Sequence, residues 1–315
     1  MLQAAATVTL ESRRRPGATH SERQQTAQGK EPPKLTAKNT KLLFALRPFS
    51  LIVAIATCSL GILLAWSAGP VSVGVSAAVL LAGLLLQAGV NLINDHADIE
   101  RLSIVGAERR AIERNARIGV AAIALACAIG VWLVTLRGWP LLLLGAVGVL
   151  GLWGYASEPI NLKSRGLGLP AVFLLTGVLM VCGAYYTVRG AMSVDVIAWS
   201  VPFSAFAALL LLANELRDFE LDRRDGHATL SARLGHARAA QLYALVAASV
   251  ALSTVALALA FGRPLVVLAV LPLGLLPLNL LGRPAQERTQ LARQTGRCYA
   301  AFTAVFLVSL GVSLP

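Results

Sequence analysis

Two short polar segments interrupt an otherwise apolar sequence, and their residue types could do chemistry. The first runs from Asn91 to Asp98 and the second from Asn214 to Asp225, each directly after a long apolar run. Acidic side chains at the end of a membrane helix are costly unless an opposite charge compensates them. Two such segments in one chain therefore predict a shared cation site.

Within each segment, an Asn and two Asp recur at a spacing that places them on one face of a helix. This spacing gives one stripe of Asn91, Asp95 and Asp98 and a second stripe of Asn214, Asp218 and Asp222. Two such stripes facing each other would repel unless hard cations bound between them. Magnesium suits this arrangement, because it takes one or two carboxylates and completes its shell with water and substrate phosphates.

Basic side chains accompany the acids. Arg217 lies within the second segment, and Lys163 and Arg165 lie in a polar stretch between two apolar blocks. Carboxylate-bound magnesium, together with Lys and Arg, can hold a diphosphate and neutralise its oxygens as it leaves. Acids beside arginines at a single helix end are often only a solvated cap or a surface ion-pair cluster. The recurrence of Asn-x-x-x-Asp in both segments favours the functional interpretation.

The composition predicts that both segments lie at the ends of membrane helices. Of the 315 residues, 56% are hydrophobic and only 14% are charged, whereas a soluble domain has about a quarter charged residues. The apolar residues fall in about nine blocks of the length that crosses a bilayer as a helix, near 46–67, 71–94, 117–136, 139–157, 168–188, 194–214, 239–261, 264–282 and 296–314. We therefore expect an all-α integral membrane protein with about nine transmembrane helices.

The basic residues alternate between the expected loops. The loops after the second, fourth, sixth and eighth blocks are rich in Arg and Lys, and the first of them carries Arg101, Arg109, Arg110, Arg114 and Arg117. The intervening loops carry one each, at Arg137, Arg189 and Arg263. The positive-inside rule then predicts a cytoplasmic N-terminus, an outside C-terminus and a cytoplasmic position for both polar segments. The net charge of +12 is explained by this bilayer topology, so no nucleic-acid partner is expected.

The chain is expected to divide into a tail and one membrane unit. Residues 1–42 are rich in Gln, Thr, Arg, Lys and Pro, and such a segment cannot bury a core. We predict a disordered, basic, cytoplasmic tail over 1–42 and a single transmembrane domain over 43–315.

At these residues the sequence resembles the UbiA superfamily of intramembrane prenyltransferases. The second segment continues through Gly226, Thr229, Arg233 and Gly235 in a pattern similar to the branch that prenylates 1,4-dihydroxy-2-naphthoate for menaquinone. The stretch from Tyr155 through Pro159 and Lys163 to Gly168, and the pair Arg47-Pro48, resemble the same branch. One difference is that the first segment lacks a later acid, since Leu stands at 102 and Ile at 104.

The resemblance implies nine transmembrane helices around a central cavity, in the cytoplasmic membrane of a bacterium. It also implies magnesium-dependent transfer of a polyprenyl group from an isoprenyl diphosphate to an aromatic acceptor. Carried over by position, the catalytic, metal-binding residues are Asp95, Asp98, Asp218 and Asp222. The expected substrate-binding residues are Asn91, Asn94, Tyr155, Lys163, Arg165, Asn214 and Arg217, of which Lys163 and Arg217 would contact the diphosphate.

Three alternatives stay open on the sequence. A specialised enzyme of the same fold could prenylate another aromatic compound or cyclise a terpenyl diphosphate without an acceptor. A secondary transporter could use the acids to couple cations, although its site would lie near the bilayer midplane rather than at helix ends. An inactive homologue retained as a partner is the third.

Overall fold

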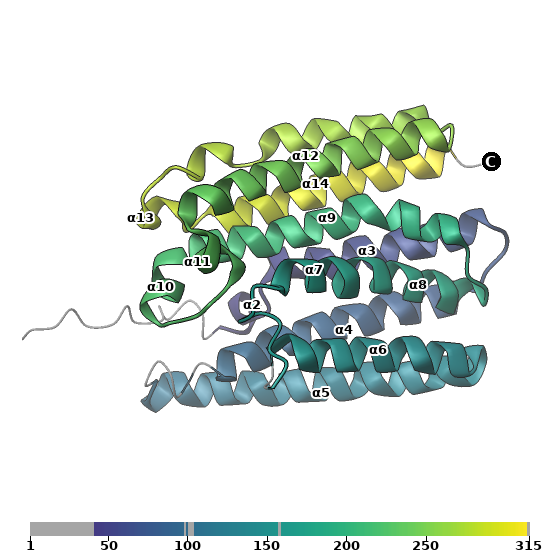
Figure 1. The fold of residues 1–315 in the computed structure, drawn as a ribbon. Helices are drawn as coiled ribbons and strands as arrows, with labels where there is room; N and C mark the ends of the chain where they lie inside the picture. The colour runs from purple at the N-terminus through teal and green to yellow at the C-terminus, as the bar shows by residue number, and fades with distance from the viewer. Residues whose placement is uncertain (1–40, 98, 100–103, 157–158, 314–315) are drawn as a thin grey trace, which may run out of the picture.

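The computed structural model describes residues 41–97, 99, 104–156 and 159–313, and the regular structure of these ranges is entirely helical (Figure 1). The predicted tail lies outside them except for its last two residues. In the first half, the helices are α2 (Leu42–Ala45), α3 (Pro48–Ser67), α4 (Val73–Ala97), α5 (Gly106–Arg137), α6 (Trp139–Ala156), α7 (Gly168–Val172), the π-helix η1 (Phe173–Leu179) and α8 (Met180–Arg189).

The second half begins with the helix that runs through the centre of the bundle. Its elements are α9 (Val194–Arg217), α10 (Phe219–Arg224), α11 (Leu230–Leu234), α12 (His236–Ala260), the 3-10 helices η2 (Pro264–Leu275) and η3 (Leu278–Leu280), α13 (Ala285–Arg288) and α14 (Leu291–Val312). Glycines end two of the long helices: Gly138 follows α5 with φ 76° and Gly190 follows α8 with φ 79°, a conformation that glycine adopts without steric cost.

The apolar blocks predicted from the sequence are helices. Within the described residues, seven helical stretches are long and apolar enough to cross a membrane, namely Pro48–Ser67, Val73–His96, Gly106–Arg137, Gly168–Arg189, Val194–Arg217, His236–Ala260 and Ala285–Val312. The other two predicted blocks coincide with shorter apolar helical stretches, Trp139–Tyr155 and Pro264–Leu280. The all-α membrane fold is therefore confirmed, and the count of nine spans stays a prediction.

One expected loop is instead part of a helix. The arginines from Arg109 to Arg117 were expected in the loop after the second block, but α5 begins at Gly106 and carries them on its first turns. The stretch after Gly106 is rich in Ala, Glu and Arg, all good helix formers. An ion pair of 2.8 Å between Arg109 and Glu113, one turn apart, supports the helix further.

The core centres on α9, which has the largest buried share among the spanning helices. Phe206 of α9 stacks on Tyr299 of α14 with ring centroids 4.5 Å apart, and Phe203 meets Phe306 edge to face at 4.9 Å. The Tyr299 hydroxyl donates to the Phe203 carbonyl oxygen at 3.0 Å, so its polar tip is satisfied inside the apolar core. This packing fixes the helix whose C-terminal end carries the second polar segment.

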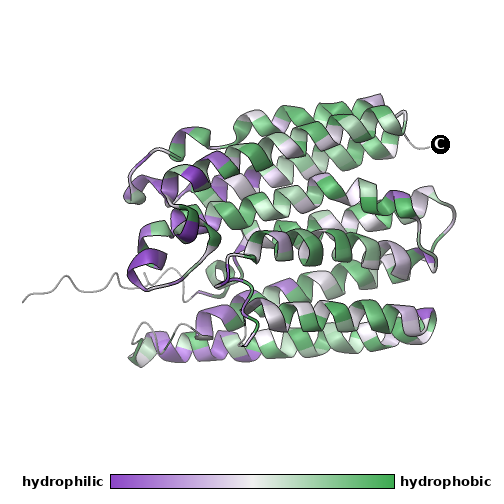
Figure 2. Cartoon of the chain, in the orientation of Figure 1, coloured by the Kyte–Doolittle hydropathy of each residue, from purple (hydrophilic) through white to green (hydrophobic). Residues whose placement is uncertain are grey.

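The polar residues gather at one end of the bundle. Figure 2 shows hydrophilic stretches over α10, α11, α13 and the first turns of α5, whereas the bodies of the long helices are mostly hydrophobic. The C-terminal ends of α4 and α9 both lie at this end (Figure 1). The fold therefore brings both predicted polar segments to the same end, although more than a hundred residues separate them in sequence.

Candidate active site

The first polar segment occupies the last turns of α4. Asn91 is buried, and its Nδ2 donates to the Leu46 carbonyl oxygen at 2.8 Å and to the Ser50 Oγ at 2.7 Å. These bonds tie α4 to the junction of α2 and α3, so Asn91 holds the Leu46 backbone before Arg47 and the Ser50 side chain after it. Asn94 is exposed, and Asp98 lies outside the described residues.

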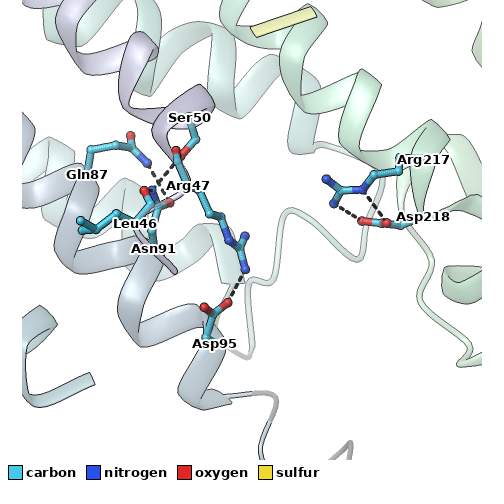
Figure 3. Close-up of polar contacts among 8 residues, drawn as sticks. All are labelled: Leu46, Arg47, Ser50, Gln87, Asn91, Asp95, Arg217 and Asp218. Carbon is cyan, nitrogen blue, oxygen red and sulfur yellow. Dashed lines mark hydrogen bonds and ion pairs between the residues drawn. The ribbon is translucent and has the colours of Figure 1, made fainter. Parts of the chain in front are cut away.

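Asp95 is paired with an arginine from the start of α3. The Arg47 guanidinium donates to the Asp95 carboxylate at 2.5 Å, and the Asp95 side chain is only 15% exposed (Figure 3). Arg47 has a left-handed φ of 49°, which is uncommon for a residue with a Cβ. Such an outlier persists where its surroundings hold it, and here Asp95 and the Asn91 bonds do so.

The second polar segment is divided between two helices, whereas its spacing predicted one continuous helix. α9 ends at Arg217, Asp218 has φ −94° and ψ 7°, and α10 begins at Phe219. The Arg217 guanidinium donates two hydrogen bonds to the Asp218 carboxylate, at 2.8 and 2.6 Å. Two helical bonds persist at Asp218: its amide donates to the Asn214 carbonyl oxygen at 3.0 Å, and the Asp222 amide donates to the Asp218 carbonyl oxygen at 2.8 Å.

Asp222 lies on α10, close to a second carboxylate and a lysine. Burial and then the negative charge of Asp218 raise the pKa of the Asp222 carboxyl, while Lys163, a hydrogen bond from Thr229 and His227 oppose this rise. The Thr229 hydroxyl donates to the Asp222 Oδ2 at 3.3 Å. The charges of Asp218 and Lys163 thus both act on the Asp222 carboxyl, in opposite directions.

The segment that carries Lys163 is tied to the second polar segment through α11. The Lys163 amide donates to the Tyr155 carbonyl oxygen at 3.0 Å, at the end of α6. The Arg233 Nη2 of α11 donates to the Ser164 carbonyl oxygen at 2.8 Å. Arg165 donates from its Nη2 to the Pro159 carbonyl oxygen at 2.7 Å and so also stabilises this loop.

The arginine of the second segment is directed toward the first segment. In Figure 3 the Arg217 guanidinium extends from the end of α9 toward the side on which Arg47 and Asp95 lie. Asn214, one turn earlier, donates from its Nδ2 to the Leu210 carbonyl oxygen at 2.9 Å, so its amide group is oriented by its own helix.

Sequence reasoning missed two charged residues at this end. Glu215 is 5% exposed and accepts a hydrogen bond of 2.9 Å from the Ser231 amide, which anchors α11 on α9. Arg288 is 2% exposed and donates to the Leu216 carbonyl oxygen at 2.7 Å. Glu215 stands inside the second segment and could have been singled out as a further acid, whereas Arg288 carries no local motif that would have identified it.

The described acids of the site lie in pairs rather than in a larger cluster. Within the described part of the chain, no three His, Cys, Asp or Glu side chains converge on one point as a metal site. Asp218 and Asp222 nevertheless offer two carboxylate ligands, and burial and then the negative charge of Asp218 raise the pKa of Asp222. Magnesium needs only one or two carboxylates when water and substrate phosphates supply the rest, so this pair fits the ion.

The fold and the polar end define an integral membrane protein with a charged site at one end of a helical bundle. The model of the UbiA prenyltransferase family matches residues 54–310, and the chain belongs to this family. It is a prenyltransferase, as the resemblance implied.

Two mycobacterial relatives carry the name 1,4-dihydroxy-2-naphthoate octaprenyltransferase. The protein of Mycobacterium leprae is 30% identical over 231 residues, and that of Mycobacterium tuberculosis is 31% identical over 230 residues. Both alignments cover 69% of this chain and 78% of the relative. These similarities support the naphthoate branch to which the motifs pointed.

A solved structure from work on digeranylgeranylglyceryl phosphate synthase in membranes has the same fold. It superimposes on this chain with a TM-score of 0.56. The match covers 87% of this chain and 97% of the other, at 16% sequence identity. The likeness therefore supports the arrangement of the helices.

Proposed function

We propose that this prenyltransferase moves a polyprenyl group from an isoprenyl diphosphate to 1,4-dihydroxy-2-naphthoate, and that it requires magnesium. The observation that carries the proposal is that the Arg47–Asp95 pair and the Arg217–Asp218 pair lie at the same end of the bundle (Figure 3), where the charges of Asp218 and Lys163 also act on Asp222. The 30–31% identity to two naphthoate octaprenyltransferases supports the choice of acceptor.

The carboxylates would hold the metal and the cations would hold the diphosphate. Asp218 and Asp222 would bind magnesium on one side, and Asp95 and Asp98 on the other. Bound magnesium would neutralise the diphosphate oxygens as the negative charge develops on them. Arg217 and Lys163 add donors to the same oxygens, and a guanidinium suits them because it can donate two parallel hydrogen bonds. Asn91 and Asn94, with Asn214, Arg165 and Tyr155, would line the substrate-binding region around this centre.

The reaction needs no covalent intermediate with the enzyme. The bond between the prenyl C1 and the diphosphate oxygen breaks, and the electron pair leaves with the diphosphate. The electron-rich ring carbon that carries the carboxylate then forms the new carbon–carbon bond. Loss of carbon dioxide returns its bonding pair to the ring and restores aromaticity, so the product is a demethylmenaquinol.

The polar end would face the cytoplasm. The first turns of α5 carry exposed arginines there (Figure 2), and cytoplasmic ends of membrane helices are enriched in Arg and Lys. Soluble diphosphate product would then leave directly into the cytoplasm, while the apolar tail of the donor stays among the membrane helices.

The test is an assay of the purified full chain in phospholipid nanodiscs with geranylgeranyl diphosphate. With 1,4-dihydroxy-2-naphthoate and magnesium, we expect prenylated naphthoquinol and one diphosphate released per product. Chelation with EDTA should stop both, and added magnesium should restore both. A cyclised terpene formed without the acceptor would instead support the specialised enzyme, and the release of no diphosphate under any of these conditions would contradict the proposal.

A further inference from the structure

A buried arginine from a distant part of the chain holds the break in the second polar segment. Arg288 is the last residue of α13, in the connection between α12 and α14, and its side chain is only 2% exposed. It is the largest of the fully buried side chains among the described residues. A buried guanidinium is costly unless its donors are satisfied, so its contacts must explain why it is there.

The two side-chain hydrogen bonds of Arg288 both lie at the junction of α9 and α10, whereas its buried Nε has no hydrogen-bond partner among the described residues. Its Nη1 donates to the Leu216 carbonyl oxygen at 2.7 Å, and its Nη2 donates to the Glu220 carboxylate. Leu216 lies two residues before Asp218, and Glu220 lies between Asp218 and Asp222. One guanidinium therefore clamps the backbone on one side of Asp218 and a side chain on the other.

The Leu216 contact has no substitute from solvent. The last carbonyl groups of a helix lack partners within that helix, and α9 ends one residue after Leu216. Leu216 is fully buried, so water cannot reach its carbonyl oxygen. A positive charge is also favoured at a helix C-terminus by the helix dipole. Arg288 thus stabilises the end of α9 at the point where Asp218 leaves it.

We infer that Arg288, paired with Glu220, is a positioning residue that sets the relative orientation of Asp218 and Asp222, and so the affinity of the enzyme for magnesium diphosphate. This inference rests on the proposed function, since it takes those two aspartates as the metal ligands. Arg288 touches neither carboxylate directly: it acts through the backbone at Leu216 and through Glu220. Partners that orient metal ligands in this way typically change metal affinity or activity about 10–100-fold when they are removed.

The variants Arg288→Gln, Arg288→Lys and Glu220→Gln test the inference in nanodiscs. Arg288→Gln should raise the magnesium concentration for half-maximal activity and the KM for geranylgeranyl diphosphate about 10–100-fold, with a smaller change in kcat. Arg288→Lys should recover part of the loss, because one ammonium can reach only one of the two acceptors. Arg283→Gln is the matched control: its ion pair with Glu287 is 3.7 Å long and both side chains are more than half exposed.

A second measurement does not depend on activity. Amide hydrogen exchange should become faster at residues 218–225 in Arg288→Gln and stay unchanged in Arg283→Gln. If Arg288→Gln does not fold, the Glu220→Gln variant tests the inference in its place. The Glu220 side chain is 52% exposed, so its substitution leaves the core intact. Unchanged exchange and unchanged magnesium dependence in Glu220→Gln would then overturn the inference. Inactivity of the unmodified enzyme with every acceptor would instead reject the proposed function, whatever the exchange data.

Discussion

The Arg47 guanidinium and the Asp95 carboxylate join the start of α3 to the last turn of α4, across 48 residues of sequence. The pair is asymmetric in exposure, at 38% for Arg47 and 15% for Asp95. A half-buried ion pair is coupled more strongly than one on the surface, because its charges are less screened. Asp95 is therefore held in a defined orientation toward the polar end of the bundle.

The first prediction concerns this pair. Arg47→Gln should lower kcat/KM about 10–100-fold, and Asp95→Asn, which also removes a proposed metal ligand, should lower it at least as much. Because either change breaks the same contact, the double variant should be no more than slightly worse than the less active single variant. Initial rates in nanodiscs measure the coupling. The control is Arg109→Gln, which removes an ion pair on α5 whose side chains are 45% and 38% exposed, and it should leave the rate unchanged. Fully additive losses would show that Arg47 and Asp95 act separately.

The second prediction separates activity from stability at Asp222. Burial and the Asp218 charge raise the pKa of Asp222 in the folded protein. Ionisation is therefore less favourable in the folded than in the unfolded chain, and this carboxyl destabilises the fold once the pH has risen through the folded-state pKa. Asp222→Asn should raise the melting temperature at neutral pH without magnesium, while transfer falls at least about 100-fold.

The control for that experiment lies at the other end of the same helix. Asp195 is exposed in the first turn of α9, and Asp195→Asn should leave activity unchanged and should not raise the melting temperature, because an acid at a helix N-terminus is favourable. Asp218→Asn should abolish transfer as Asp222→Asn does. Retention of full activity in either variant would remove these two residues from the metal site.

The third prediction uses the lysine that opposes the raised pKa of Asp222. Metal binding needs the ionised carboxylate, so the acidic limb of the profile of kcat/KM against pH should follow Asp222. The positive charge of Lys163 lowers that pKa. Lys163→Gln should therefore move the acidic limb to higher pH, in addition to any loss of rate from weaker diphosphate binding.

The measurement is the pH of the acidic limb of the kcat/KM profile, determined at a subsaturating magnesium concentration. Lys41 is exposed and is not among the charges that act on Asp222, so Lys41→Gln should leave the limb in place. A limb that stays at the same pH in Lys163→Gln would show that another group controls activity on the acidic side.

The sequence predicted the helices well because bilayer-length apolar blocks leave little freedom. The break at Asp218 was not predicted, since spacing alone treats residues 214–222 as one helix. The Arg217–Asp218 pair lies at this break, and Arg288, 70 residues away, donates to the last turn of α9 beside it. Such long-range contacts leave no periodic trace in the sequence.

The candidate site could likewise be predicted from the sequence only in part. Four of its charged residues could be singled out from the sequence because charged residues are rare in this chain: Asp95, Asp218, Asp222 and Lys163. The partner of Asp95 could not, because Arg47 reaches it only once Asn91 has docked α4 against the start of α3. Tertiary contacts of this kind decide which of several nearby cations an acid meets.

The last prediction concerns the packing of η1 against α9, which holds the central helix in place. A Cβ added at Gly177 would lie 2.2 Å from Ser204 Oγ and 2.6 Å from Ser204 Cα. Since part of the obstruction is backbone, a rotamer change cannot relieve it. Gly177→Ala should lower the free energy of unfolding by about 1–3 kcal/mol, measured as thermal stability in detergent.

Gly183→Ala, in the neighbouring helix α8, is the matched control. Its added methyl group would meet no atom within 4 Å, and alanine favours a helix over glycine, so stability should be equal or slightly higher. Removing the Ser204 side chain with Ser204→Gly should rescue Gly177→Ala only in part, because the Ser204 Cα would still lie too close. Equal stability of Gly177→Ala and Gly183→Ala would show that η1 can move away from α9 without cost, and that this contact does not position the central helix.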